Sequence, residues 1–374
     1  MSILAAHAQD LAALGAKDRL RSLRPRAGVD FSSNDYLGLA ESARLREAVT
    51  SALDRGVPVG SGGSRLLRGN HAEHEALEAE AAVFFGAEAA LFVGSGYAAN
   101  AMLLATLPQT GDLVIHDELI HASAHEGMRL SRATRVGAAH NDVDAVDDAI
   151  RGWRAQGGTG TPWIAVESLY SMDGDRAPLG SLVEVADRHG AMLLIDEAHA
   201  TGVFGPNGRG LAAELDGREN VVVLRTCGKA LACEGALVLC PATVRDFLVN
   251  RGRPFIFSTA PSPLMATAVR EALRILGDEP ERRERLRALV GHAEQALARC
   301  GVTATGSQIL PLIVGEDGAA MRLAARVQAD GFDARAVRPP TVPAGTARLR
   351  LSITLNIGEA EIEALADAIG EARA

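Results

Sequence analysis

The sequence predicts an α/β fold in which helices cover a mostly parallel sheet, followed by a smaller α+β part. From about residue 37 to 270, strand-like aliphatic runs alternate with helix-like stretches: ALFVG, DLVIHD, WIAVES, MLLIDE, VVVLRT and GALVLC. Such alternation is typical of a parallel sheet covered by helices. Beyond Pro261 and Pro263 the pattern changes to helix-period segments and short strands. A chain of 374 residues also exceeds the size at which one hydrophobic core keeps growing, so we expect at least two domains.

We expect three parts along the chain. Residues 1–36 form an N-terminal helical arm, whose helix runs to about residue 28, where basic residues and Pro25 end it. Its apolar stripe consists of Leu4, Leu11, Leu14 and Leu20. Residues 37–270 form the large α/β domain. Residues 271–374 form a C-terminal α+β domain, with helices at ATAVREALRIL and ERLRALVGHAEQALARC, strands near QILPLIVG and ARLRLSIT, and a closing helix from Gly358.

Composition limits the classes of partner and compartment. The formal net charge is −9, and basic residues cluster only at residues 19–26 and 282–287, so nucleic acid is not expected as the main partner. No apolar run approaches the ~20 residues of a membrane span, and no cleavable leader is evident, so we expect a cytoplasmic protein without a membrane partner. The four cysteines lack C-x-x-C spacing, which predicts neither a metal site nor a disulfide framework.

The segment AMLLIDEAHATG, residues 191–202, carries the strongest chemical signal. Apolar residues run to Ile195 and stop at Asp196, which indicates a buried strand ending in a carboxylate where open α/β sheets bind ligands. The next strand candidate, VVVLRT, delivers Thr226 and then Lys229 to the same edge. Taken singly, a strand ending in Asp-Glu also occurs in Walker B sites, and Gly-Lys can be an ordinary turn. Together, an acid and an amine at one edge are the protein groups that pyridoxal phosphate chemistry requires.

Glycine clusters indicate a site for a phosphate. GSGGSRLLRGNH, from Gly60 to His71, lacks the Walker A spacing. GSG at 94–96 follows the strand ALFV and opens an apparent helix, whose unpaired N–H groups suit a phosphate. A nucleotide-binding α/β protein is an alternative, but no G-x-G-x-x-G opens a helix after the first strand.

These motifs together resemble the α-oxoamine synthases, fold-type I pyridoxal phosphate transferases. The resemblance rests on SSNDYLGL, GSGGSRLLRGNH, GSGYAAN, HAS, SMDGD, DEAHATG and TCGK, which occur in the family's order and cover nearly the whole chain. The segment RPPTVPAGTARLRLS, residues 338–352, is most similar to members that condense L-alanine with a pimeloyl thioester in biotin synthesis. Members that use glycine with succinyl-CoA or acetyl-CoA need the same catalytic groups, so they stay open as alternatives.

The resemblance implies four catalytic residues. Lys229 would bond covalently to the cofactor and act as the base at the substrate's α carbon. Asp196 would pair with the ring nitrogen, and His199 would hydrogen-bond the phenolic oxygen. His121 would stack on the ring and face the substrate. Either histidine could instead be a satisfied core residue.

The family's binding residues are carried over in the same way. The phosphate would be bound by the N–H groups of Gly96 and Tyr97 and by the hydroxyls of Ser171 and Thr226. Ser258 and Thr259 would reach the phosphate of a partner subunit, which implies a homodimer with shared active sites. Substrate-binding positions would be Asn34 and Arg350 for the amino acid carboxylate, and Arg21, Arg338 and Thr341 for the acyl substrate. Arg350 could also be a solvated strand residue.

Some positions depart from the family pattern. Ala200 stands where glycine is usual, and Cys233 and Glu234 stand where smaller residues are commoner, which leaves the acyl specificity open. Whether the acyl donor is carried by coenzyme A or by a carrier protein is open as well. A catalytically inactive partner subunit of the same family is a further alternative, but such subunits lack the lysine present here as Lys229.

Overall fold

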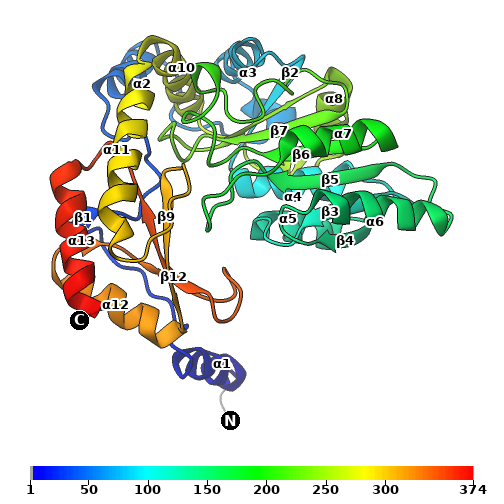
Figure 1. Cartoon of the computed structure of the whole chain (residues 1–374). Helices are drawn as coiled ribbons and strands as arrows, with labels where there is room; N and C mark the ends of the chain where they lie inside the picture. The colour runs from blue at the N-terminus through cyan, green and yellow to red at the C-terminus, as the bar shows by residue number, and fades with distance from the viewer. Residues whose placement is uncertain (1–2, 374) are drawn as a thin grey trace. The chain divides into compact units, whose positions relative to one another are not determined.

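The computed structural model describes residues 3–373, and these form two compact units (Figure 1). One unit, here called the sheet unit, comprises Leu37–Ser171 and Arg176–Arg283. The other, here called the terminal unit, comprises the chain up to Tyr36, the tetrapeptide Met172–Asp175 and the chain from Glu284 onward. This division differs from the expected three parts. The arm and the C-terminal part share one unit. The helix α10 (Pro263–Asp278), which crosses the expected boundary, packs on α2 (Ala43–Asp54) and α3 (Ala72–Phe85) of the sheet unit.

A seven-stranded sheet in the order β2-β8-β7-β6-β5-β3-β4 forms the centre of the sheet unit. Its strands are β2 (Ala89–Val93), β3 (Leu113–Asp117), β4 (Thr134–Ala138), β5 (Pro162–Glu167), β6 (Met192–Asp196), β7 (Val221–Thr226) and β8 (Ala236–Cys240). Only β8 runs antiparallel to its neighbours, which confirms the predicted mostly parallel sheet. The six aliphatic runs are all strands. Because β5, β6 and β7 are parallel, their carboxyl ends meet at one edge.

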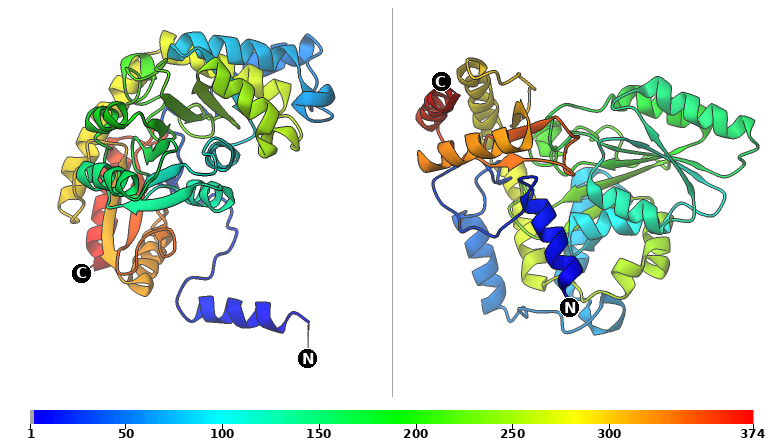
Figure 2. Two further views of the ribbon diagram at one scale, coloured as in Figure 1. Left: turned by 90° about the vertical axis from the view of Figure 1, so that its right-hand side faces the viewer. Right: turned by 90° about the horizontal axis from the view of Figure 1, so that it is seen from below.

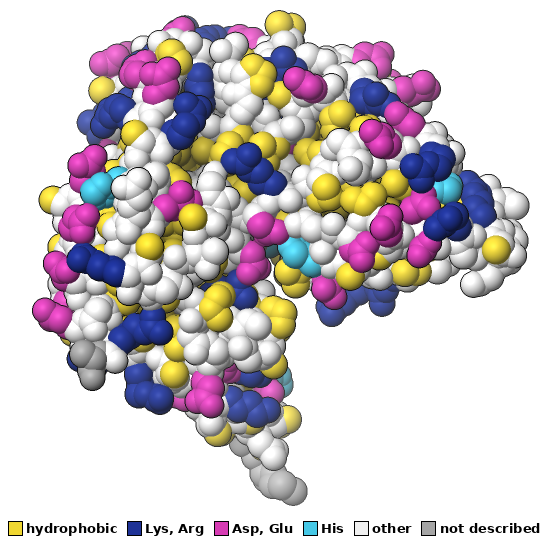
Figure 3. Space-filling view, in the orientation of Figure 1, with side chains coloured by type: hydrophobic (Ala, Val, Ile, Leu, Met, Phe, Trp, Pro, Cys, Tyr) yellow, Lys and Arg dark blue, Asp and Glu magenta, His cyan; other side chains and the backbone are white. Residues whose placement is uncertain are grey.

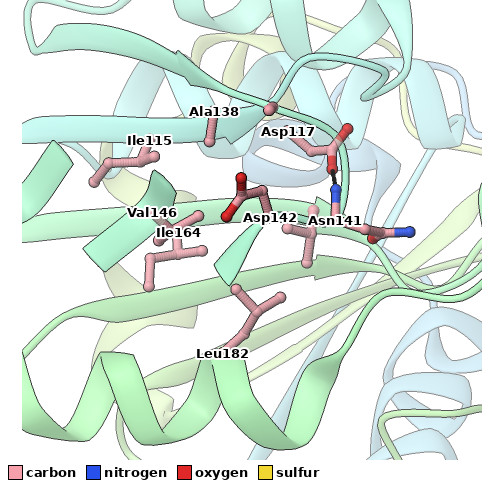
Figure 4. A pocket seen from close by; sticks show the side chains of 10 residues that line it. Ile115, Asp117, Ala138, Asn141, Asp142, Val146, Ile164 and Leu182 are labelled. Carbon is pink, nitrogen blue, oxygen red and sulfur yellow. Dashed lines mark hydrogen bonds between the residues drawn. The ribbon is translucent and has the colours of Figure 1, made fainter. Parts of the chain in front are cut away.

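Helices cover both faces of this sheet, and alternate side chains of each strand point to opposite faces. On one face, Leu194 and Leu224 pack in a buried cluster with residues of α4 (Gly96–Thr106) and α5 (Ala122–Leu130). On the other face, side chains of β3 and β5 meet α6 (Val143–Ala155) and α7 (Leu179–His189) around a cavity of about 10 Å³ (Figure 4). That volume barely admits one water, so this cavity is no substrate site.

Several further helices complete the sheet unit. They are α2 (Ala43–Asp54), a π-helical turn (Arg65–Gly69), α3 (Ala72–Phe85), a 3-10 turn (Pro206–Gly208), α8 (Ala242–Arg251) and α9 (Arg253–Ile256). Within residues 3–373, no helix combines the length and the apolar character needed to cross a membrane. On the face that Figure 3 shows, basic and acidic side chains are interspersed.

The terminal unit is built on an antiparallel sheet in the order β11-β12-β9. Its elements are β9 (Ile309–Gly315), β11 (Ala336–Val337), β12 (Ala347–Ser352), the parallel pair β1 (Val29–Asp30) and β10 (Phe332–Asp333), and helices α11 (Glu281–Ala298), α12 (Asp317–Ala329) and α13 (Glu359–Arg373). The tetrapeptide Met172–Asp175 packs on these strands. Arg348 donates to Met172 O at 3.2 Å and pairs with Asp173, and a Cβ on Gly174 would lie 2.3 Å from Ile309 O.

The N-terminal helix is shorter than expected. α1 spans Ala5–Gly15, whereas the apolar stripe predicted a helix to about residue 28. None of its residues is buried, and Figure 2 shows it standing apart from the strands and helices of its own unit. The prediction was wrong because no packing favours further turns, and Asp18 adopts a left-handed conformation with φ of 55°. Pro25 also disfavours helical geometry at the residue before it.

Candidate active site

Lys229 and His199 form a direct contact at the carboxyl edge of the sheet. Lys229 lies in the turn after β7, and His199 lies in the turn after β6 and is buried. Lys229 Nζ is 2.6 Å from His199 Nε2. A hydrogen bond between two nitrogens requires one of them to supply a lone pair, so the two groups cannot both be fully protonated. The predicted amine and imidazole are therefore brought together in a form suited to proton transfer.

The lysine also stands out chemically. The chain contains only two lysines, Lys17 and Lys229, among 38 basic residues. Lys17 lies exposed beyond α1. An amine can lose its proton and attack an aldehyde, whereas a guanidinium stays charged and cannot. The one lysine at the sheet edge is therefore the chain's candidate for covalent chemistry.

Asp196 ends β6 and is held in one orientation. Its carboxylate is 5% exposed. Oδ1 accepts from the N–H of Ala198 at 2.9 Å, and Oδ2 accepts from Nδ2 of Asn100 at 2.7 Å. Hydrogen bonds to both oxygens fix the orientation of this side chain, as a partner for the ring nitrogen of a pyridine cofactor requires.

The start of α4 forms a cradle for an anion. Ser95 caps the helix, and its Oγ accepts from the N–H of Ala98 at 3.1 Å. A Cβ on Gly96 would lie 3.3 Å from Thr226 Oγ1, so the first residue of α4 and the last residue of β7 are adjacent. Tyr97 follows in the first turn and is exposed. Three of the predicted phosphate-binding residues thus surround a helix N-terminus, where partial positive charge favours a phosphate.

His121 caps α5 next to this site. Its Nδ1 accepts from the N–H of Ser123 at 3.2 Å and lies 2.7 Å from Ser123 Oγ. Burial lowers the pKa of His121, and the charge of Lys229 lowers it further, whereas Asp196 acts in the opposite direction. His121 is therefore within electrostatic range of both residues and favours its neutral form.

Glu167 is a site residue that the sequence analysis missed. It ends β5 as the register partner of Asp196 on β6, and it is 2% exposed. Its Oε2 accepts from the N–H of Ser171 at 3.2 Å. Burial, followed by the negative charge of Asp196, raises the pKa of Glu167 to about 8. Two neighbouring strands that each end in an acid, WIAVE and MLLID, were the signal that could have revealed it.

The terminal unit brings together the two residues predicted to bind a carboxylate. Arg350, on β12, is 7% exposed, and its Nη2 donates to Asn34 Oδ1 at 3.1 Å and to Tyr36 Oη at 3.2 Å. Its Nη1 donates to Ser352 Oγ at 2.8 Å. The guanidinium is thus buried and oriented rather than solvated, which removes the alternative of a surface strand residue.

The predicted acyl-binding residues also lie in the terminal unit. Arg338 donates to the backbone oxygen of Asp18, and the N–H of Thr341 donates to Arg338 O at 3.1 Å. Burial lowers the pKa of Arg338, and the positive charge of Arg21 lowers it further. Arg21 and Thr341 are exposed. In the sheet unit, Ser258 and Thr259 are exposed after α9.

The departures from the family pattern have visible structural settings. Ala200 is fully buried, and Cys233 is buried as a free thiol. Glu234 is exposed. Ala232, three residues after Lys229, has φ of 53°, a left-handed conformation that glycine adopts without cost.

The sheet-edge residues fit pyridoxal phosphate. Lys229 supplies an amine for its aldehyde, Asp196 a fixed carboxylate for its ring nitrogen, and the start of α4 an anion cradle for its phosphate. Asn100 Oδ1 and Glu167 Oε1 are buried there without a hydrogen-bond partner among the described residues. Buried polar atoms of this kind are normally satisfied, so the site is built to hold a further polar group.

Comparison with known proteins extends this result to the whole chain. The model of the family aminotransferase class I and II matches residues 26–369. An 8-amino-7-oxononanoate synthase from Anaeromyxobacter dehalogenans (strain 2CP-1) is 43% identical over 370 residues, which cover 95% of this chain and 92% of that protein. The structure of an 8-amino-7-oxononanoate synthase from Francisella tularensis superposes with a TM-score of 0.78 at 25% identity, covering 92% of this chain and 97% of that one.

A second solved structure carries the cofactor. A serine palmitoyltransferase from S. paucimobilis, with a bound adduct of pyridoxal phosphate and myriocin, superposes with a TM-score of 0.89 at 27% identity and covers 100% of this chain and 98% of that one. These matches span nearly the whole sequence and confirm the predicted fold and cofactor class. The chain therefore belongs to the aminotransferase class I and II family of pyridoxal phosphate enzymes, and within it to the 8-amino-7-oxononanoate synthases.

Proposed function

We propose that this enzyme condenses L-alanine with a pimeloyl thioester and releases carbon dioxide and the free thiol, which yields 8-amino-7-oxononanoate. The observation that carries the proposal is the contact of Lys229 Nζ with His199 Nε2, at the same sheet edge as the fixed carboxylate of Asp196. The 43% identity to a named 8-amino-7-oxononanoate synthase supports the choice of substrates.

The cofactor would be held by the sheet unit. When bound, pyridoxal phosphate supplies an electron-withdrawing ring that stabilises negative charge at the substrate's α carbon. Asp196 would keep the ring nitrogen protonated, and Lys229 would hold the aldehyde carbon. The N–H groups at the start of α4, with the hydroxyls of Thr226 and Ser171, would bind the phosphate.

The chain's own groups would move the proton and bind the substrate. The amine of Lys229, freed when alanine binds, would take the proton from the α carbon, and its neighbour His199 would tune that amine through their hydrogen bond. Arg350 would bind the substrate carboxylate through two parallel N–H bonds, as a guanidinium does best. Asn34, already bonded to Arg350, would hold that guanidinium in place.

The acyl substrate and the partner subunit are assigned on weaker contacts. Arg21, Arg338 and Thr341 would bind the acyl substrate, since guanidinium groups suit an anionic chain end or a phosphate. Ser258 and Thr259 would reach the cofactor phosphate of a second copy, so the active form would be a homodimer. The four free, buried cysteines fit a reducing compartment such as the cytoplasm.

A substrate panel tests the assignment. Purified enzyme would be assayed with alanine or glycine against pimeloyl, succinyl and acetyl thioesters. We expect turnover to be fastest with alanine and the pimeloyl donor. Since a pocket for one methyl group discriminates by only about 10–200-fold, glycine should retain measurable turnover. Preference for glycine with succinyl or acetyl donors would refute the assignment in favour of another α-oxoamine synthase.

A labelling experiment tests the cofactor bond separately. Borohydride reduction of the yellow protein should fix the cofactor on one lysine, and peptide mass mapping should place it on Lys229. Lys17 is the only other lysine side chain in the sequence, so the result is unambiguous. Labelling of Lys17 alone would remove Lys229 from the proposed chemistry.

A further inference from the structure

A chain of buried hydrogen bonds joins Asp196 to His121 across α4 and α5. Asn100, on α4, is 2% exposed, and its Nδ2 lies 2.7 Å from Asp196 Oδ2 and 3.0 Å from Ser123 Oγ. Ser123, on α5, is 1% exposed, and its Oγ lies 2.7 Å from His121 Nδ1. Two side chains without a role in the proposed reaction therefore connect two residues that would contact the cofactor ring.

The chemistry of these side chains decides which atom donates and which accepts in each of these hydrogen bonds. Asp196 can only accept hydrogen bonds, so the amide nitrogen of Asn100, not its oxygen, must face the carboxylate. The second hydrogen of that amide points to Ser123 Oγ. Because this oxygen already accepts from Asn100, its own hydrogen is available to His121 Nδ1. That nitrogen also accepts from the N–H of Ser123, so the proton of the neutral imidazole belongs on Nε2.

The packing of the two helices is specialised at this point. Gly127 lies one turn after Ser123 on α5. A Cβ there would lie 2.8 Å from Asn100 O and 3.0 Å from Ala101 Cα, so only glycine allows this approach of α5 to α4. The short distance between Asn100 and Ser123 depends on this close contact.

We infer that Asn100 and Ser123 are positioning residues that jointly fix the orientation of the Asp196 carboxylate and the Nε2–H tautomer of His121. The inference rests on the proposed function, in which Asp196 and His121 hold the cofactor ring. The contact between α4 and α5 thereby aligns Asp196, at the edge of the ring, with His121, on its face. One continuous series of hydrogen bonds connects the two side chains.

A double-mutant cycle on cofactor affinity tests the connection. Equilibrium dissociation constants for pyridoxal phosphate would be measured for the native protein, Asn100→Leu, Ser123→Ala and the double variant. We expect each single change to weaken affinity by about tenfold, the usual consequence of losing a hydrogen bond to a charged or buried partner. The double variant should lose less than the product of the two single effects, because both changes break the same chain. Independent, multiplying effects would overturn the inference.

The tautomer of the His121 ring can be measured directly, and a general loss of packing is not expected to change it. With ¹⁵N-labelled histidine, the His121 ring signals, assigned from His121→Gln among ten histidines, should show a proton on Nε2 and an accepting Nδ1. Ser123→Ala, which removes one oxygen and is expected to fold, should shift the Nδ1 signal toward that of an unbonded nitrogen. An unchanged signal would overturn the inference even if Asn100→Leu fails to fold.

Thr267→Val is the matched control. Thr267 is a buried hydroxyl on α10 that donates to Pro263 O at 3.2 Å, so its loss has a similar packing effect away from the site. It should change neither cofactor affinity nor the His121 signals. Both measurements need no substrate, so a failed assay with alanine and the pimeloyl donor would refute the proposed function while leaving this inference to be judged on its own data.

Discussion

Two adjacent carboxylates, Asp196 and Glu197, have opposite surroundings. Asp196 faces α4 and lies beside Asn100 and Glu167. One side-chain oxygen of each of these two neighbours has no hydrogen-bond partner among the described residues. Glu197 points to the other face of the sheet. There its Oε2 lies 3.1 Å from Arg225 Nη1, and its Oε1 accepts from the N–H of Ala212 at 2.9 Å.

The network around Glu197 pairs opposite charges with one another. Arg225 is fully buried, and its Nη2 contacts both carboxylate oxygens of Asp216 at 2.8 and 2.9 Å. Its guanidinium carbon lies 4.2 Å from the ring centroid of Phe85. The same strand ends thus carry an ion network that stabilises the fold and a polar cluster that receives a ligand. Burial and charge alone do not distinguish the two. In the Glu197 network each acid faces a guanidinium, whereas Asp196 is held by an amide and a backbone N–H.

The largest effect should come from Lys229→Ala on the ligand-binding face. Loss of the general base alone lowers turnover by about 10²–10⁴-fold. The variant should also lose the covalent cofactor bond, while its free energy of unfolding changes by less than about 1 kcal/mol. Turnover assays and urea unfolding measure the two. Lys17→Ala, in the exposed arm, is the control and should match the native enzyme. A large loss of stability in Lys229→Ala would contradict the proposed contrast between a ligand site and an ion network that stabilises the fold.

Glu197→Ala should produce the reverse pattern. Removing one partner leaves a buried guanidinium with less compensation, which costs about 3–5 kcal/mol of unfolding free energy. Urea unfolding measures the loss, and Glu214→Ala, an exposed acid nearby, should cost little. A loss below about 1 kcal/mol would mean that the ion network of Glu197, Arg225 and Asp216 does not stabilise the fold.

Gly210→Ala should destabilise the same network by steric contact. A Cβ at Gly210 would lie 1.5 Å from Glu197 Oε2, and its φ of 93° also disfavours alanine. We expect the free energy of unfolding to fall by about 1–3 kcal/mol more than the unfavourable backbone conformation alone would cost. The variant Gly56→Ala measures that backbone cost by itself, because Gly56 has φ of 81° with nothing within 4 Å of the added carbon. Equal losses for the two variants would rule out a steric contribution at Gly210.

The last prediction concerns pH and Glu167. Its folded-state pKa of about 8 lies above the ordinary pKa of 4.5 for a glutamate, so between these pH values the folded protein binds more protons than the unfolded chain. The stability of the cofactor-free protein should therefore fall as pH rises through this range. Glu167→Gln keeps the size of the side chain and removes the titration, so its stability should fall less. Parallel pH dependences for the two proteins would place the titration elsewhere.

Much of this arrangement could be predicted from sequence. The inner strands are buried on both faces, so they appear as continuous aliphatic runs, and the residues that follow them necessarily meet at one edge. β4 was missed because four of its five residues are exposed and TRVGA contains no apolar run. The helical arm was overestimated because its leucine stripe has no surface to pack on.

The polar connections between helices could not be predicted. Asn100 and Asp196 are 96 residues apart, and no local pattern links them. The contact of Asn100 with Ser123 depends in turn on how closely α5 approaches α4, and the absence of a side chain at Gly127 allows that approach. Nor does periodicity reveal that Glu197 and Asp196 serve different purposes, since both follow one strand.

The tetrapeptide Met172–Asp175 imposes an order on the protein's biosynthesis. Its ion-pair partner Arg348 is translated 175 residues after Asp173. At ribosomal speeds of about 5–20 residues per second, the loop waits roughly 10–35 s before its binding strands emerge. The nascent chain therefore carries this loop unanchored, and the terminal unit, with its buried Arg350, can mature only after β12 has been synthesised.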